Sequence, residues 1–131
     1  MGRPGALGPL GSSAVSETEQ TTELAPERAA ELAREGAPLI DVRNEDEHEA
    51  GHIGGDRLIP FDRLKDEAGS LPQDQPVVLY CRGGDRSGAA VQALRASGYD
   101  AYSVEGGILG WTENGLPIEG EVADRDVLPP A

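Results

Sequence analysis

The sequence predicts an α/β fold in which a mostly parallel sheet is covered by helices on both faces. Short apolar runs of strand length alternate with helix-like segments along most of the chain. The clearest run, residues 76–80, leads through a glycine-rich loop directly into a helix-like segment. Charged residues follow the runs where they end, and in open α/β sheets ligands bind at the carboxyl ends of the strands. We therefore expect the functional site at that edge of the sheet.

Size and composition exclude several classes of protein. The chain has 131 residues, which is the length of one domain. Its net charge of −13 argues against nucleic acid or an anionic membrane surface as a partner. No apolar run approaches the roughly 18–20 residues that span a bilayer. The single cysteine, Cys81, excludes an internal disulfide and a multi-thiolate zinc site.

The two ends of the chain differ from its middle. Residues 1–21 are rich in Gly, Pro, Ser, Thr and Glu, so we expect a disordered N-terminal arm, and its GPLGS segment is either a tag remnant or natural chain. The arm lacks the basic and apolar regions of a secretory signal, which predicts a cytoplasmic location. One domain is expected over residues 22–119, followed by a C-terminal tail over residues 120–131.

The first predicted helix covers residues 26–35, which begin with a proline and end before a glycine. A buried strand over residues 38–42 follows. It brings Asp41 to the carboxyl edge of the sheet, with Arg43 just beyond.

Two short helices are predicted next. Asn44 caps the first of them, an acidic helix over residues 45–50. A tight glycine-rich connection then leads to residues 58–60, and a further short helix covers residues 61–67.

The second half of the chain repeats the alternation. A strand over residues 76–80 is followed by a helix over residues 87–96 and a strand over residues 101–104. A final short helix carries Trp111.

The segment CRGGDRS at residues 81–87, here called the cysteine loop, has the features of an anion-binding loop. A glycine-rich turn between a strand and a helix points successive N–H groups inward at the positive end of the helix dipole. These groups and the nearby Arg86 favour the thiolate form of Cys81, which is the nucleophilic form. Most lone cysteines are inert core residues, but this context favours a reactive one.

The other residues of the cysteine loop are candidates for substrate binding. Gly83 and Gly84 allow close approach of the backbone to an anion. Arg82 and Arg86 are placed to receive an anionic substrate, with Arg82 the weaker candidate and solvated surface charges the alternative. Asp85 belongs to the same loop, and capping of the following helix is its expected role.

Four motifs occur in a fixed order along the chain: LIDVR at 39–43, EHEAGHI at 47–53 with IP at 59–60, VVLYCRGGDRS at 77–87, and GGILGW at 106–111 with GLP at 115–117. In this order and spacing they resemble the rhodanese domain, and specifically the single-domain thiosulfate sulfurtransferases. The resemblance covers residues 22–119.

The resemblance implies a rhodanese-like fold with a parallel five-stranded sheet, and a sulfurtransferase activity. Cys81 would take sulfane sulfur from thiosulfate or a related small anionic donor and become a persulfide. The persulfide would pass its sulfur to cyanide, to a thiol, or to a protein such as thioredoxin or a sulfur carrier. The loop from Cys81 to Arg86 would bind the outer sulfur and the donor's oxyanion, while Asp41 and Arg43 resemble a bracing ion pair.

Other residues receive smaller roles from the same resemblance. Trp111 is expected to pack in the core, and His52 to take part in hydrogen-bonded structure. His48 receives no role. Asp56 and Arg57 replace a small residue usual in the family, a departure expected to affect only the local surface.

Two alternatives remain open. A related phosphatase or arsenate reductase would use the same thiolate cradle, but four residues separate Cys81 from Arg86, one fewer than in the phosphatase signature. A non-catalytic interaction module is the second alternative, although such modules typically lack the cysteine. No metal, nucleotide or flavin is indicated by the ligand-type residues or by the glycine-rich loop.

The contrast between the acidic chain and the arginines of the cysteine loop suggests an electrostatic prediction. Turnover with thiosulfate should be sensitive to salt. Arg86→Ala should raise the KM for the donor more than Arg3→Ala does.

Overall fold

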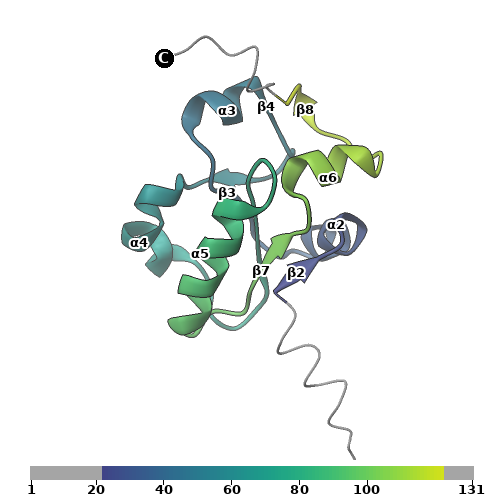
Figure 1. The fold of residues 1–131 in the computed structure, drawn as a ribbon. Coiled ribbons are helices and arrows are strands. Elements are labelled where there is room, and N and C mark those ends of the chain that lie inside the picture. The colour runs from purple at the N-terminus through teal and green to yellow at the C-terminus, as the bar shows by residue number, and fades with distance from the viewer. Residues whose placement is uncertain (1–21, 123–131) are drawn as a thin grey trace, which may run out of the picture.

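A computed structural model describes residues 22–122 of the protein. The arm expected over residues 1–21 and the tail from residue 123 lie outside the described residues. Within residues 22–122 the core is a five-stranded sheet with strand order β2-β7-β6-β3-β5, in which every neighbouring pair is parallel (Figure 1). The strands are β2 (Glu23–Leu24), β3 (Leu39–Asp41), β5 (Arg57–Leu58), β6 (Val77–Tyr80) and β7 (Ala101–Val104). The predicted five-stranded parallel sheet is confirmed.

Helices cover both faces of this sheet, also as predicted (Figure 1). On one face lie α2 (Pro26–Arg34) and α6 (Gly107–Glu113), and on the other lie α4 (Leu64–Glu67) and α5 (Asp85–Ala96). No helix among residues 22–122 is long and apolar enough to cross a bilayer.

Strand β6 is buried on both faces and sets the direction of the cysteine. Its side chains alternate, so that Val77 and Leu79 join the core beneath α4 and α5, while Val78 and Tyr80 join the core beneath α2 and α6. Cys81 continues this alternation and lies on the α5 side of the sheet.

Two predicted helices have different bounds in the structure. The segment predicted as one helix over residues 61–67 consists of η1 (Phe61–Arg63), α4 and η2 (Ala68–Ser70). Leu64 is its only buried residue, and a single apolar anchor does not stabilise a regular helix of this length. Helix α5 begins at Asp85 rather than at residue 87, because the left-handed Gly84 ends the loop earlier.

A second, two-stranded antiparallel sheet was not predicted. It pairs β4 (Gly51–His52) with β8 (Glu119–Gly120), next to α3 (Glu45–Ala50). Strand β8 is short and exposed, so it has no apolar signature, and it crosses the domain boundary expected at residue 119. Together with α3 this small sheet lies at the end of the molecule where α5 begins (Figure 1).

Candidate active site

Cys81 lies at the carboxyl end of β6, and its side chain is buried, with 1% of the residue exposed. Three groups that can donate hydrogen bonds surround its Sγ atom. The N–H groups of Gly84 and Ser87 donate to Sγ over 3.1 and 3.3 Å, and the Ser87 hydroxyl lies 3.5 Å away. These donors belong to the loop and to the first turn of α5, where the helix dipole favours negative charge. The arrangement directs hydrogen-bond donors at Sγ from three sides of the same turn.

The cysteine loop is held from behind by α6. The Ile108 N–H donates to the carbonyl of Cys81 over 2.9 Å, and the Leu109 N–H donates to the carbonyl of Arg82 over 3.2 Å. A Cβ atom on Gly107 would lie 2.4 Å from the Arg82 oxygen, so this close approach requires glycine. Gly107, the second glycine of the GGILGW motif, therefore allows α6 to pack directly against the backbone of the cysteine loop.

Arg86 is paired with a carboxylate that sequence reasoning did not select. Both of its terminal nitrogens donate to Glu47 of α3, over 2.8 and 3.0 Å. The hydrogen bond to Glu47 raises the pKa of Arg86. Burial acts against the charge of Glu47, but the hydrogen bonds from Arg86 and from the Asn44 N–H lower its pKa overall. The sequence signals for Glu47 were its place in the EHEAGHI motif and at the third position of a capped helix, and neither indicated Arg86 as its partner.

The structure places the remaining loop residues as follows. Gly84 is the N-cap residue of α5, with a left-handed φ of +113°. Asp85 is exposed in the first turn and makes no cap, so the predicted capping role is wrong; its charge still faces the favourable end of the helix dipole. Gly83 is exposed, and a Cβ atom there would meet no atom within 4 Å. Arg82 is partly buried.

Asp41 and Arg43 form a buried ion pair at the end of β3. Arg43 Nε donates to Asp41 Oδ1 over 2.9 Å, and Nη2 donates to Oδ2 over 2.8 Å. The same Nη2 donates to the carbonyl of Gly51 over 2.6 Å, which ties the strand to β4. The pair thus braces the backbone beside the cysteine loop.

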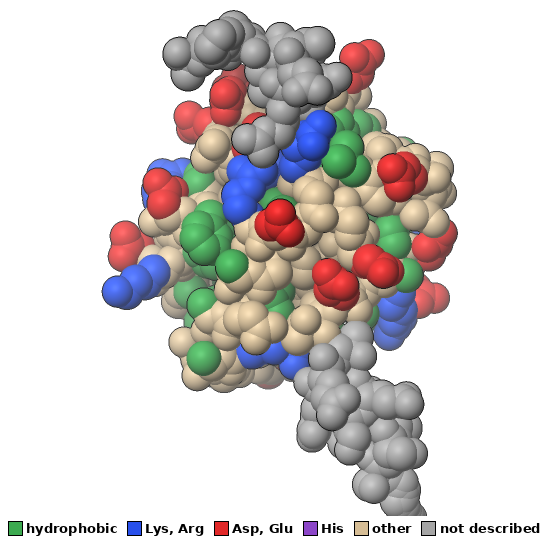
Figure 2. All heavy atoms as spheres, viewed as in Figure 1, with side chains coloured by type: hydrophobic (Ala, Val, Ile, Leu, Met, Phe, Trp, Pro, Cys, Tyr) green, Lys and Arg blue, Asp and Glu red, His purple; other side chains and the backbone are tan. Residues whose placement is uncertain are grey.

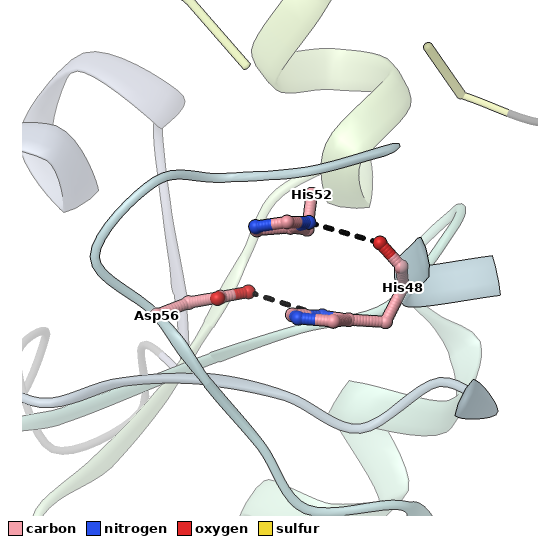
Figure 3. Close-up of side chains that lie close together, drawn as sticks. All are labelled: His48, His52 and Asp56. Carbon is pink, nitrogen blue, oxygen red and sulfur yellow. Dashed lines mark hydrogen bonds and ion pairs between the residues drawn. The ribbon is translucent and has the colours of Figure 1, made fainter. Parts of the chain in front are cut away.

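Both histidines belong to a partly buried hydrogen-bond network next to this pair. Figure 3 shows their rings beside Asp56. His48 Nδ1 lies 2.9 Å from Asp41 Oδ2, and His52 Nδ1 lies 2.9 Å from the His48 carbonyl. The Tyr80 hydroxyl donates to Asp56 Oδ2 over 2.5 Å and accepts from the Ile53 N–H. His52 therefore has the structural hydrogen bond that was expected, and His48 has a partner that was not.

Asp56 corrects one prediction. The departure at residues 56 and 57 was expected to affect only the surface, but the side chain of Asp56 is 3% exposed. Burial raises the pKa of Asp56. Burial, together with the Asp41 carboxylate and the hydrogen bond to Asp56, raises the pKa of Tyr80, so its hydroxyl stays protonated and donates. This pair secures the chain between β4 and β5 to the residue that precedes Cys81.

His48, His52 and Asp56 are close enough together to be considered as metal ligands. The two imidazole rings are stacked, however, with centroids 4.0 Å apart and an angle of 15° between their planes (Figure 3). A metal ion lies close to the plane of each imidazole that binds it, at about 2.0–2.1 Å from nitrogen. Parallel stacked rings do not meet this requirement, so the geometry fits a hydrogen-bonded brace better than a metal centre.

Trp111 packs in the core of the α2 and α6 face and is 4% exposed. Its Nε1 donates to the carbonyl of Pro117 over 2.8 Å. A hollow of about 460 Å³ lies beside it, on the face of the sheet opposite to Cys81. The lining residues are Ala30, Ala33, Arg34, Leu39, Ile53, Gly54, Trp111, Leu116, Pro117, Ile118 and Glu119. This hollow is separate from the thiol.

Comparisons with known proteins agree with this geometry. The family profile described as the Rhodanese-like domain matches residues 25–114. An uncharacterized protein of Bacillus subtilis, YqhL, is 46% identical over 76 residues, which are 57% of this chain and 60% of that protein. The chain thus spans less than two thirds of this relative's length.

Two further matches cover most of the compared protein. The thiosulfate sulfurtransferase GlpE of Pseudomonas paraeruginosa is 34% identical over 89 residues, which are 67% of this chain and 81% of that enzyme. A crystal structure of a rhodanese-related protein from Thermoplasma volcanium superimposes with a TM-score of 0.69 and 31% identity, covering 76% of this chain and 98% of that one.

Proposed function

Because the chain belongs to the rhodanese-like domain family, we propose that it is a sulfurtransferase that carries sulfane sulfur on Cys81. The observation that supports this most directly is the set of hydrogen-bond donors around Sγ, namely the N–H groups of Gly84 and Ser87 and the Ser87 hydroxyl. In the proposed reaction these donors stabilise negative charge on the attacking sulfur, and no general base is required.

The first step of the proposed reaction loads the cysteine. The Cys81 thiolate attacks the outer, sulfane sulfur of thiosulfate, forming an S–S bond while the bond between the two sulfur atoms of the donor breaks. Sulfite leaves with the electron pair of that bond, and the protein is left as the persulfide anion. No oxidant and no proton are needed. The donors around Sγ favour both the starting thiolate and the negative charge of the product.

The second step transfers the sulfur from Cys81 to an acceptor. A thiophilic acceptor attacks the outer sulfur of the persulfide, and the Cys81 thiolate is regenerated as the leaving group. With cyanide as the acceptor the product is thiocyanate. A low-molecular-weight thiol, or a protein such as thioredoxin or a sulfur carrier, would accept the same sulfur at its own nucleophilic atom.

We assign the donor's oxyanion to the cysteine loop. Gly83 leaves its side of the backbone open, which favours close approach of the anion. Arg82 and Arg86 add positive charge, although the charge of Arg86 is offset by Glu47. Arg86 therefore acts mainly by holding the loop against α3, and Asp85 remains at the exposed rim.

Intact-mass measurement and turnover test the proposal together. The purified protein, incubated with thiosulfate alone, should gain the mass of one sulfur atom, and with thiosulfate and cyanide it should form thiocyanate. Cys81→Ser should do neither. An adduct without turnover would support the persulfide on Cys81 and would indicate that its acceptor is not cyanide.

The absence of both adduct and turnover would refute the proposal. It would favour the non-catalytic interaction module, and hydrolysis of an aryl phosphate would then test the phosphatase alternative. The four-residue spacing from Cys81 to Arg86 argues against that alternative, because it leaves a smaller cradle.

A further inference from the structure

Two serine hydroxyls lie in direct contact beneath Cys81, in the interior of the protein. Ser87 is in the first turn of α5 and Ser103 is on β7, and both residues are 0% exposed. Their Oγ atoms are 2.6 Å apart. Buried polar side chains away from a functional site are uncommon, and a hydroxyl buried without a hydrogen bond is destabilising.

The direction of this hydrogen bond follows from counting partners. Among residues 22–122, Ser87 Oγ is the one hydrogen-bond partner of Ser103 Oγ. If Ser87 donated to Ser103, the hydroxyl proton of Ser103 would be buried and unpaired. A buried donor without an acceptor costs more than a typical hydrogen bond contributes. Ser103 therefore donates, and Ser87 accepts.

This direction leaves the single hydroxyl proton of Ser87 for another acceptor. Two are in reach: Sγ of Cys81 at 3.5 Å and the carbonyl of Gly84 at 3.3 Å. The Gly84 carbonyl already accepts the Gly88 N–H over 2.9 Å. A thiolate is a charged acceptor, and hydrogen bonds to charged groups are stronger than those between neutral groups. The Ser87 proton thus turns to Sγ when the cysteine is ionised.

We propose that Ser103 is a positioning residue for the reactive thiol, because its hydroxyl fixes the Ser87 hydroxyl as a third donor to Sγ of Cys81. Ser103 does not touch the sulfur itself; it acts from the neighbouring strand through Ser87. The inference deepens the proposed function and rests on it only in taking Cys81 as the reactive group. It concerns ionisation of the thiol, which can be measured without any sulfur transfer.

The test is the pH profile of Cys81 alkylation by iodoacetamide, followed by intact mass between pH 5 and pH 10. Cys81 is the only cysteine, so the rate reports this thiol alone. We expect the midpoint of the profile to rise by about one pH unit in Ser87→Ala and by roughly half a unit in Ser103→Ala. The double variant should show no further rise beyond Ser87→Ala, since Ser103 acts through Ser87.

An isosteric pair keeps the test valid if the alanine variant folds poorly. Ser103→Thr and Ser103→Val add the same volume, but only threonine keeps a hydroxyl. We expect the threonine variant to keep the wild-type midpoint and the valine variant to raise it. Val91→Ala, which opens the same core without removing a hydroxyl, should leave the midpoint unchanged.

Three results would overturn the inference: an unshifted midpoint in Ser103→Ala, equal midpoints in the threonine and valine variants, or additive shifts in the double variant. Failure of the proposed function is distinguishable, because it would appear as a missing sulfur adduct while the alkylation profiles still separate the variants.

Discussion

The bidentate pair of Arg86 and Glu47 changes the role of the arginine that the loop sequence suggested. A free guanidinium at the cradle would attract an anionic donor through its charge. In the structure that charge is shared with a carboxylate whose side chain is 13% exposed. The pair joins the first turn of α5 to α3, so it holds the geometry of the cysteine loop.

This pairing predicts similar effects from its two members. Arg86→Ala and Glu47→Gln should each raise the KM for thiosulfate by on the order of five- to tenfold, because each releases the loop from α3. The double variant should be no worse than either single variant. Steady-state kinetics with thiosulfate and cyanide provide the measurement.

Arg3→Ala is the control, because it removes a positive charge far along the sequence from the cysteine loop. The KM of this variant for thiosulfate should match that of the wild type. A lower KM in Glu47→Gln would contradict the prediction, because it would mean that freeing the Arg86 charge helps donor binding.

The lowered pKa of Glu47 predicts an effect of acid on stability. A carboxyl group whose pKa is lower in the folded state contributes stability above its ordinary value of 4.5, and this contribution is lost as pH falls through the folded value. The free energy of unfolding should therefore decline below about pH 4.5 more steeply in the wild type than in Glu47→Gln. Urea titrations between pH 3 and pH 7 measure the difference.

A matched variant is needed because Asp56 has the opposite effect to Glu47 on the free energy of unfolding at low pH. Its raised pKa means that protonation relieves a buried charge as pH falls. Glu45→Gln, which removes an exposed carboxylate from the same helix, should keep the wild-type slope. Equal slopes in all three proteins would show that the Glu47 pair contributes nothing to acid stability.

At the level of elements, the contact between α6 and the cysteine loop is the one most sensitive to substitution. The first amides of α6 bind the carbonyls of Cys81 and Arg82. Gly107 makes this approach possible and also has a left-handed φ of +63°. A side chain there would have to displace the loop backbone.

Gly107→Ala should therefore destabilise the protein by about 2–5 kcal/mol, the sum of backbone strain and overpacking. It should also reduce sulfur transfer, because the N–H donors would leave their positions around Sγ. Gly115→Ala is the matched control: its φ is +77°, but a Cβ atom there meets nothing within 4 Å.

The control variant should lose only about 1–2 kcal/mol from strain. Urea unfolding and thiocyanate formation separate the two outcomes. Equal losses in both variants would show that the contact with Arg82 does not matter.

At the scale of the whole molecule, strand order and charge distribution determine where an anionic ligand would bind. The connections leaving β3 and β6 run toward opposite edges of the sheet. The carboxyl ends of these two strands therefore form the switch point at which α/β proteins typically bind ligands. Acidic side chains are spread over the visible face. Some basic side chains lie close together near the start of α5, while others are scattered over the same face (Figure 2). If the donor is a dianion, as proposed, this distribution would repel it at long range and attract it only close to the cysteine loop.

This contrast predicts the direction of the salt effect. The kcat/KM for thiosulfate should rise as ionic strength increases from 0.01 M to 0.15 M, because the Debye length falls from about 30 Å to about 8 Å and screens the net charge of −13 before it screens the loop. An uncharged thiosulfonate ester should show no such rise. The same rise with the uncharged donor would exclude long-range repulsion as the cause.

The sequence by itself determined the parts of this protein that depend on contiguous residues. The alternation of strands and helices, the bounds of α3 and β7, and the placement of Cys81 at the start of an anion-binding loop follow from periodicity, capping and turn chemistry within short segments. The resemblance of the four motifs added the number of strands in the sheet.

Only the tertiary structure decided which distant side chains meet. Glu47 and Arg86 are 39 residues apart, Asp56 and Tyr80 are 24 apart, and Ser87 and Ser103 are 16 apart. Each pair forms where separate elements pack together, and periodicity indicates that a residue is buried or exposed but not which partner it will face. For the same reason the exposed strand β8 and the buried Asp56 were missed, since neither leaves a pattern in its neighbours along the chain.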